Sequence, residues 1–199
     1  MKTVLLTAFE PFGTWPANSS QLCLQAVLPQ CPPGLHVTSR VYPVDFSTVR
    51  AALWTDLQAG YDFCVHLGQA QQTGRMRLEA VAINVGGLPG QPEDEYVSLQ
   101  PDGPVAVQST LPVPEWAVLL REQGIPAYVS YHAGTFLCNA TLYWSRLFTD
   151  ELRLATRTCF IHVPLATSQV VASQGDWPTL PTATAAEAVR CILEQLATL

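Results

Sequence analysis

Apolar residues along the chain follow two alternating patterns. Short continuous apolar runs that end at turn residues are typical of strands buried on both faces of a sheet. Between these runs, apolar residues recur every three or four positions, as they do on one face of a helix. The runs that predict strands cover residues 4–8, 37–42, 63–67, 78–85, 127–131 and 159–163.

Segments with helical spacing lie between these strands and after the last one. Asn18 or Ser19 is expected to cap the first helix and Asp45 the second, because their side-chain oxygens accept hydrogen bonds from the free N–H groups of a first turn. Pro164 predicts the end of strand pairing, and the capping box Thr184-Ala-Ala-Glu187 marks the last helix. Helices are expected around residues 22–27, 46–57, 116–123, 138–150 and from 184 onward.

One segment departs from this alternation. Residues 86–104 collect glycines, prolines and acids, which predicts a long loop, with a hairpin over residues 96–107. No internal repeat or linker interrupts the rest of the chain. The sequence therefore predicts an α/β fold in which helices cover a mixed, mostly parallel sheet, built as a single domain over residues 1–199.

Composition excludes several classes of protein. The chain has 199 residues, of which 48% are hydrophobic, enough for one substantial core. Its formal net charge is −6 and no cluster of Lys and Arg offsets that charge, so we expect no nucleic-acid partner. Because the only lysine is Lys2, an internal Schiff-base lysine and the lysine of a phosphate-binding P-loop are excluded.

Apolar run lengths and cysteine spacing indicate the compartment. The N-terminal run is too short for a signal peptide, and no stretch approaches the roughly 18 apolar residues of a membrane-spanning helix. We therefore expect a cytoplasmic protein with no membrane partner, whose six cysteines are thiols. No C-x-x-C or H-E-x-x-H motif occurs, so we expect neither a metal nor another cofactor.

Cys138 is the residue that most strongly indicates chemistry. It lies in the run His132-Ala-Gly-Thr-Phe-Leu-Cys-Asn-Ala140, between a predicted strand and a predicted helix. Sheets of this type hold their sites beyond the carboxyl ends of strands, and the free N–H groups of a first helical turn favour a thiolate and an oxyanion. Cys138 is therefore predicted to be a nucleophile. The alternative is a buried cysteine that serves as a small apolar residue.

A thiol nucleophile needs a base. The best-placed histidine is His162, because it stands near the end of a strand-forming run, where the following proline directs the chain toward the loop edge of the sheet. The alternative for His162 is a core histidine bonded to a neighbour. The other candidates for the base are His36, His66 and His132.

Glu79 is the candidate to orient that base. It has mostly apolar neighbours in sequence, so its carboxylate is costly to bury without a partner. A hydrogen bond from His162 would fix the tautomer of the ring and stabilise the imidazolium. The structural alternative is an ion pair with Arg75 or Arg77.

Together, these residues resemble the pyroglutamyl peptidase type I family of cysteine exopeptidases. The resemblance covers almost the whole chain, and its five segments occur in the family's order. They are Leu6-Thr-Ala-Phe-Glu-Pro-Phe-Gly13 with Asn18-Ser-Ser20, Gly68-Gln-Ala70, Glu79-Ala-Val-Ala-Ile-Asn84, Ser130-Tyr-His-Ala-Gly-Thr-Phe-Leu-Cys-Asn139, and Phe160-Ile-His-Val-Pro164.

The resemblance implies a fold and a reaction. The fold is a three-layer αβα sandwich similar to that of purine nucleoside phosphorylases. The reaction is removal of an N-terminal pyroglutamate from peptides by a triad of Cys138, His162 and Glu79, through a thioester. Members of the family are often tetramers, so a homo-oligomer, tetramer or dimer, is also expected.

The resemblance further implies a pocket for the lactam ring of pyroglutamate. Phe9 and Phe12 match its apolar walls, although ordinary core aromatics are the alternative for these two residues. Asn18 and Gln69 match the groups that read the lactam, which suits an amide side chain because it offers both a donor and an acceptor.

The sequence departs from the family beside this site. Where the family has an arginine directly after the triad glutamate, this chain has Ala80. The segment after Asn84, Val85-Gly-Gly-Leu-Pro-Gly-Gln-Pro92, is shortened and has no arginine, and the glycine pair before the family's arginine is altered to Gln71-Gln72. Arg75 or Arg77 is the candidate to replace the missing arginine.

Two other functions stay open at this stage. One is a cysteine amidase that acts on another small lactam or acyl amide. The other is a binding module on the same fold without turnover. A nucleoside phosphorylase is disfavoured, because the chain has no glycine-rich phosphate loop or arginine cluster.

Overall fold

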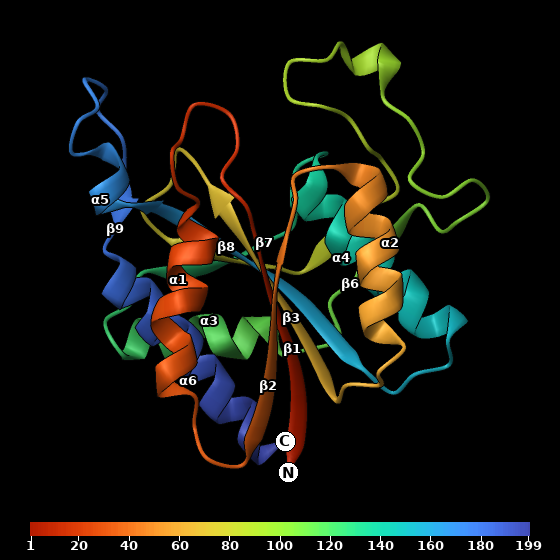
Figure 1. Ribbon diagram of the computed structural model, residues 1–199, viewed down its shortest axis with the longest axis horizontal. Coiled ribbons are helices and arrows are strands. Elements are labelled where there is room, and N and C mark those ends of the chain that lie inside the picture. Colours follow the sequence, from red (N-terminus) through yellow and green to blue (C-terminus); the bar gives the residue numbers. More distant parts are fainter.

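The computed structural model describes all 199 residues, with a central sheet between two layers of helices (Figure 1). Its strands are β1 (Lys2–Phe9), β2 (Leu35–Tyr42), β3 (Phe63–Ala70), β4 (Met76–Glu79), β7 (Ala127–Ser130), β8 (Arg157–Ala166) and β9 (Thr179–Leu180). Their order is β2-β1-β3-β8-β4-β7, with β9 paired to the end of β8. Only the β4–β8 pair is antiparallel, which confirms the mixed, mostly parallel sheet.

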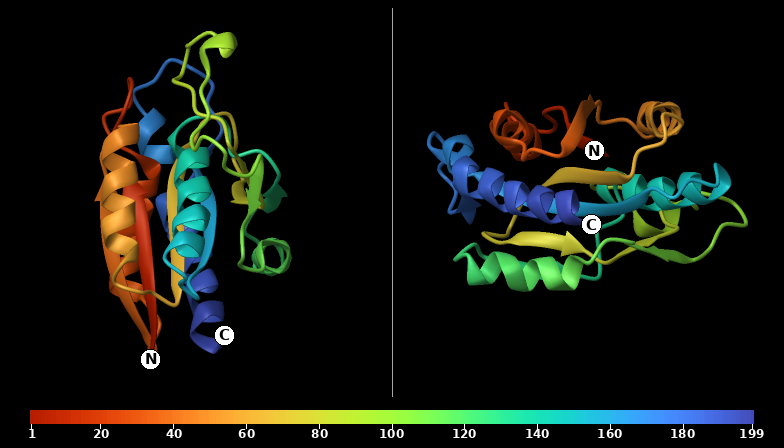
Figure 2. Two further views of the ribbon diagram at one scale, coloured as in Figure 1. Left: turned by 90° about the vertical axis from the view of Figure 1, so that its right-hand side faces the viewer. Right: turned by 90° about the horizontal axis from the view of Figure 1, so that it is seen from below.

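Helices cover both faces of this sheet. One layer holds α1 (Ser19–Val27), α3 (Val113–Glu122) and α6 (Thr182–Thr198), and the other holds α2 (Phe46–Leu57) and α4 (Leu137–Glu151) (Figures 1 and 2). Alternation along β1 explains the two layers, because Val4 and Leu6 pack in the first core whereas Leu5 packs in the second. No helix is both long enough and apolar enough to cross a membrane.

The predicted caps of the first two helices are confirmed. The Asn18 side chain accepts a hydrogen bond from Ser20 N–H at 3.0 Å, and Asp45 accepts one from Thr48 N–H at 2.8 Å. The hydroxyls of Ser47 and Thr48, with that N–H group, lower the pKa of Asp45 to about 2. Both helices therefore begin where the polar residues of the sequence indicated.

The strand expected over residues 78–85 is instead two strands in different sheets. β4 ends at Glu79, and β5 (Val81–Ile83) pairs antiparallel with β6 (Ala106–Gln108). The break falls at Ala80, whose N–H donates to Ser130 while its carbonyl accepts from Ser109. The chain thus leaves the main sheet immediately after Glu79.

The hairpin expected over residues 96–107 does not form. Its two ends do not pair with each other: Val97 forms a bridge with Gly86, and β6 pairs with β5. The segment from residue 84 to 105 is consequently a long excursion that starts and ends beside α4. Figures 1 and 2 show it at the end of the molecule opposite the two termini.

Two other boundary predictions are wrong. β8 continues through Pro164 to Ala166, because β4 pairs with β8 only as far as His162 and a residue without an N–H group is tolerated beyond that point. The last helix begins at Thr182, after Pro181, so the capping box at residues 184–187 does not form. Glu187 binds Arg190 instead, at 2.6 Å.

Several short elements escape the sequence pattern. They are too short to show a hydrophobic period, or they lie in segments predicted to be loops. They comprise α5 (Thr167–Val170), β9, and the 3₁₀ turns η1 (Leu28–Gln30) and η2 (Glu93–Glu95).

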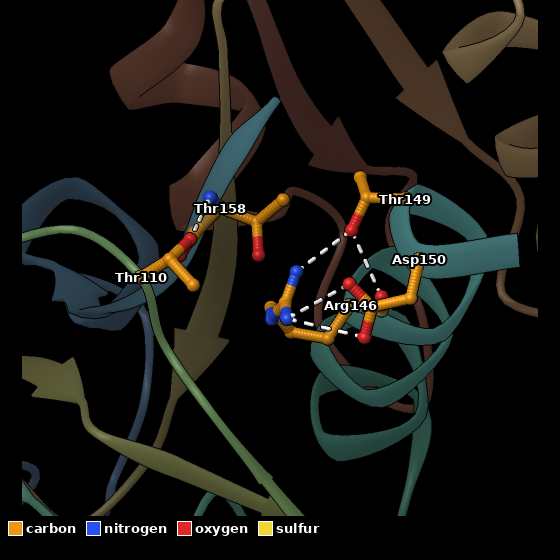
Figure 3. Close-up of polar contacts among 5 residues, drawn as sticks. All are labelled: Thr110, Arg146, Thr149, Asp150 and Thr158. Carbon is orange, nitrogen blue, oxygen red and sulfur yellow. Dashed lines mark hydrogen bonds and ion pairs between the residues drawn. The ribbon is translucent and has the colours of Figure 1, made fainter. Parts of the chain in front are cut away.

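Polar contacts at the start of β8 serve the fold. Thr158 N–H donates to the Thr110 hydroxyl at 2.7 Å (Figure 3). Thr110 N–H donates to the Thr158 carbonyl at 2.9 Å. On α4, Arg146 donates to Thr149 and to Asp150, at 2.8 and 3.1 Å (Figure 3). Thr158 lies at the amino end of β8, so these contacts are remote from the carboxyl-end loops where a site is expected.

Candidate active site

A cavity of about 220 Å³ opens at the carboxyl ends of β1 and β3. This is the edge of the sheet at which α/β folds place their ligands. The sequence-predicted residues in its lining are Phe9, Phe12, Asn18, Gln69, Cys138 and His162. Glu79 lies outside the lining, and its side chain is fully buried.

Cys138 is the second residue of α4 and is partly exposed. The N–H groups of Leu137 and Cys138 have no backbone acceptor, as expected in a first helical turn. The sulfur lies closely over β3, because a Cβ added to Gly68 would stand only 2.8 Å from it. Gly68 is paired with His162 in the register of β3 and β8, so the thiol is brought to the imidazole.

Glu79 and His162 form the second contact of the site. Oε1 of Glu79 lies 2.7 Å from Nδ1 of His162, and Oε2 contacts no donor. The alternative partners of Glu79 form no ion pair with it, and the Arg75 guanidinium lies over the Tyr128 ring, 4.3 Å from its centroid. His162 is therefore the group that engages this buried carboxylate.

The charges around His162 favour its protonated form. Burial alone lowers the pKa of His162, but the charge of Cys138 and its hydrogen bond, together with the hydrogen bond and charge of Glu79, outweigh burial and raise the pKa to about 10. The Cys138 sulfur lies over Gly68, the residue paired with His162 in the sheet. The arrangement can hold an imidazolium between a thiolate and a carboxylate.

The remaining histidines lie elsewhere. His36 is exposed on β2, and His132 is exposed in the loop before α4, where its Nδ1 accepts a hydrogen bond from Gly134 N–H. His66 is fully buried between Thr7 and Cys64. None of these three lines the cavity.

The two phenylalanines of the expected lactam pocket serve both the cavity and the packing around it. Phe9 packs against Phe160, with ring centroids 6.4 Å apart, and Phe12 packs against Phe136 at 6.2 Å. Both rings also line the cavity. The two interpretations given for these residues, pocket wall and core aromatic, are therefore compatible.

The two amides of the expected pocket are strongly constrained. The Asn18 amide donates to the Glu10 carbonyl at 2.9 Å, and its oxygen accepts from Ser20. The Gln69 oxygen accepts from Ser19 N–H at 2.9 Å, whereas Nε2 of Gln69 has no partner in the protein. Gln69 is therefore a lining residue of the cavity that holds a buried donor without a partner in the protein.

The sequence did not identify one part of the cavity lining. It includes Leu88, Pro89 and Tyr96 from the arginine-free loop. Asn139, the residue after the nucleophile candidate, holds the start of this loop by donating to the carbonyls of Ile83 and Val85, each at 2.9 Å. The glycine- and proline-rich composition predicted a loop but could not show which of its residues line the cavity.

Neither candidate replaces the missing arginine. Arg75 is stacked on Tyr128, and neither Arg75 nor Arg77 lines the cavity. Ala80 starts the turn between β4 and β5. The lining of the cavity consequently contains no arginine.

The thiol of Cys138 is partly exposed at the start of a helix, and it lies near an imidazole that is bound to a carboxylate. This combination of groups is typical of cysteine hydrolases. Comparison with known proteins narrows that class. A sequence model of pyroglutamyl peptidases matches residues 2–198, so the chain belongs to the pyroglutamyl peptidase family, a family of hydrolases.

Individual relatives match over nearly their whole length. The pyrrolidone-carboxylate peptidase of Streptomyces coelicolor is 40% identical, with 97% of this chain and 91% of the relative covered. The crystal structure of pyrrolidone carboxyl peptidase from Fervidobacterium islandicum matches with a TM-score of 0.93 at 31% identity, over 100% and 99% of the two chains. That from Thermococcus litoralis matches with a TM-score of 0.87 at 29% identity, over 100% and 94%. These matches confirm the family resemblance and the fold.

Proposed function

We propose that this protein is a cysteine exopeptidase that removes an N-terminal pyroglutamate from peptides, with Cys138 as nucleophile, His162 as general acid and base, and Glu79 as the residue that orients His162. One observation carries the proposal. A buried carboxylate holds His162 at 2.7 Å beside the Cys138 thiol, at the edge of a mostly apolar cavity. Family membership supports the same reaction, since relatives carry the name pyrrolidone-carboxylate peptidase.

The first half of the reaction forms a thioester. The Cys138 thiolate attacks the carbonyl that joins pyroglutamate to the next residue, and the oxyanion that develops is stabilised by free N–H groups of the first turn of α4. The tetrahedral intermediate collapses as the C–N bond breaks. The imidazolium of His162 donates its proton to the leaving amine, so the shortened peptide leaves as a neutral amine.

The second half releases pyroglutamate. His162, now neutral, accepts a proton from a water molecule that attacks the thioester. The second tetrahedral intermediate expels the Cys138 thiolate, and the imidazolium is restored. Glu79 keeps its charge throughout, holding Nδ1–H and stabilising the imidazolium.

The cavity supports selection of a neutral ring. Phe9 and Phe12 supply apolar surface, and we assign Asn18 and Gln69 to hydrogen bonds with the lactam. A site that hydrogen-bonds the ring carbonyl rejects proline, which has the ring but lacks the oxo group.

The domain, compartment and substrates that we propose are those expected from the sequence. We assign the chain, over residues 1–199, to one catalytic domain that acts in the cytoplasm on peptides with an N-terminal pyroglutamate. No nucleic acid or membrane takes part, and no metal or other cofactor has a step in the mechanism. Assembly into a dimer or tetramer stays a prediction.

The experiment is a release assay with three matched fluorogenic amides, pyroglutamyl, prolyl and glutaminyl aminomethylcoumarin. We expect release from the pyroglutamyl amide, and rates at least about 10³-fold lower for the other two. Iodoacetamide and the substitution Cys138→Ser should abolish release, whereas Cys64→Ser, at a fully buried thiol, should retain it.

Each alternative predicts another result. Preference for the prolyl amide, or for a different acyl amide, would identify a cysteine amidase of other specificity. Lactam binding without product from any amide would identify a binding module. Full activity of the Cys138→Ser variant would exclude the proposed triad.

A further inference from the structure

A second glutamine stands behind Gln69, outside the cavity lining. Gln169 lies on α5, the short helix that follows β8, and is half-buried. Its Nε2 donates to the Gln69 oxygen at 2.9 Å and to the Ala17 carbonyl at 2.8 Å. Its own oxygen accepts from Ala166 N–H at 2.7 Å. All hydrogen-bonding partners of the Gln169 amide therefore lie within the protein.

The orientation of the Gln169 amide is fixed by the backbone. The Ala166 N–H group can only donate and the Ala17 carbonyl can only accept, so a rotation of the amide by 180° would lose both bonds. This orientation leaves Nε2 of Gln169 facing Gln69. A backbone-fixed donor thus points at Gln69.

The orientation of the Gln69 amide follows from two such donors. Ser19 N–H and Gln169 Nε2 both converge on the oxygen of Gln69, each at 2.9 Å. A rotated Gln69 would bring its own N–H groups against both donors. Nε2 of Gln69 must therefore point away from them, and it is the end that has no partner in the protein, on a side chain that is only 9% exposed and lines the cavity.

We propose that Gln169 is a positioning residue for substrate specificity: it fixes the Gln69 amide so that the cavity offers an N–H donor, and not a carbonyl acceptor, to the ring of the substrate. The proposal rests on the proposed function. The matching group on pyroglutamate is the ring carbonyl, because it accepts hydrogen bonds whereas the ring N–H only donates. Selection of the oxo group thus depends on a residue that does not line the cavity.

The substitution Gln169→Glu tests this directly. It keeps the oxygen that accepts from Ala166 N–H but replaces the donor to Gln69 and to the Ala17 carbonyl by an acceptor. Gln69 then turns its N–H group toward the new carboxylate and presents its oxygen to the cavity. We expect KM for the pyroglutamyl amide to rise about 50-fold with kcat changed less than about threefold, because a ground-state contact is lost.

Gln169→Ala separates positioning from a merely structural role. Alanine removes all three hydrogen bonds of the Gln169 side chain, but Ser19 N–H still holds the Gln69 oxygen. Positioning predicts a rise in KM of only about fivefold, smaller than for glutamate. A rise in KM for alanine that equals or exceeds the rise for glutamate would overturn the proposal.

Protonation of the carboxyl group introduced by Gln169→Glu should restore the wild-type KM. The introduced carboxyl group, once protonated, again offers a donor to Gln69, so KM should fall back toward the wild-type value as the pH is lowered toward 5. The proposal would be contradicted if KM had the same pH dependence in the Gln169→Glu variant as in the wild-type protein. Gln30→Glu, at an exposed glutamine bonded only to Ala26, is the matched control and should leave KM unchanged.

Binding of pyrrolidinone, the bare five-membered lactam, distinguishes failure of this proposal from failure of the proposed function. Turnover by wild type with an unchanged KM in Gln169→Glu would defeat the positioning role and leave the peptidase intact. If the wild-type protein binds pyrrolidinone but does not turn over the pyroglutamyl amide, the proposed peptidase function is excluded. The positioning role is then tested by the dissociation constants of pyrrolidinone for the two Gln169 variants, which should rise more for glutamate than for alanine. Neither binding nor turnover by wild type would defeat both.

Discussion

Two cysteine–histidine pairs have opposite electrostatics: one lies within β3, and the other joins α4 to β8, the strand next to β3. In the first, Cys64 lies 3.3 Å from Nε2 of His66, and the Thr7 hydroxyl lies 2.7 Å from Nδ1. All three residues are fully buried. Burial lowers the pKa of His66 to about 3 and raises that of Cys64, so this pair is neutral at physiological pH.

The second pair, Cys138 and His162, lies two residues further along the paired strands β3 and β8. In the register of β3 and β8, His66 is opposite Phe160, and Gly68 is opposite His162, the partner of Cys138. His162 is nearly as buried as His66, at 6% exposed, yet its pKa is raised to about 10. Burial is therefore not what separates the two histidines.

Two features make the difference. His162 has a buried carboxylate, Glu79, at 2.7 Å, whereas His66 has only a hydroxyl. Cys138 stands at the start of α4, where free N–H groups favour a thiolate, whereas Cys64 lies within β3. Neighbouring charges, and not burial, therefore set the opposite pKa shifts of the two histidines.

The largest expected contrast comes from substituting each histidine in turn. His162→Gln should lower kcat/KM for the pyroglutamyl amide by about 10⁴-fold, because the general acid and base is lost. His66→Gln should leave kcat/KM, measured per folded molecule, within about threefold. Equal losses in the two variants would end the comparison.

Glu79→Gln should lower kcat/KM by about 10³-fold and also change its pH dependence. The raised pKa of His162 means that the imidazolium is present below about pH 10 and is lost as the pH rises through that value. Without the carboxylate, the alkaline decline of kcat/KM should move to lower pH. A decline at the same pH in wild type and variant would show that Glu79 does not stabilise the charge.

Gly68→Ala should lower kcat/KM by about 10²-fold, through misplacement of the reacting groups. The added Cβ would lie 2.8 Å from the Cys138 sulfur and 2.5 Å from Cζ of Phe160. Gly74→Ala is the control, because its nearest neighbour would be at an ordinary 3.5 Å. Wild-type kinetics for Gly68→Ala would mean that the thiol does not need its position over β3.

The smallest effect concerns stability and the unreactive pair. The pKa of His66 in the folded chain, about 3, is below its ordinary value of about 6.5, so the unfolded chain binds more protons between these values. Stability should therefore fall as the pH drops, with about 2 kcal/mol lost by pH 5 through this group. Chemical denaturation of His66→Gln should lack this loss, and an unchanged pH slope would contradict the neutral state of His66.

Most of the fold could be predicted because its signals are local. The apolar runs of β1 and β3 and the caps Asn18 and Asp45 act within a few residues. The errors fall where distant partners decide. The break after Glu79 depends on Ser130 and Ser109, and the pairing of β6 depends on β5.

The candidate site divides in the same way. The strand-loop-helix setting of Cys138 is visible in the sequence, and the family resemblance supplied the ring-binding positions. The wall formed by Leu88, Pro89 and Tyr96 was not predictable, because loop composition does not specify which side chains turn inward. Gln169 was missed because its contacts with Gln69 and Ala17 are set by tertiary packing.

We infer that His162, which is bound to a carboxylate, is charged at neutral pH, whereas His66, which is also buried, is neutral. NMR of the ring nitrogens in ¹⁵N-histidine-labelled protein from pH 4 to 10 tests it, with His162→Gln and His66→Gln to assign the signals. We expect one ring to keep both nitrogens protonated until about pH 10 and its signals to be lost in His162→Gln. A second ring should stay neutral throughout, and its signals should be lost in His66→Gln. A His162 ring that loses its proton at the ordinary value of about 6.5 would contradict it.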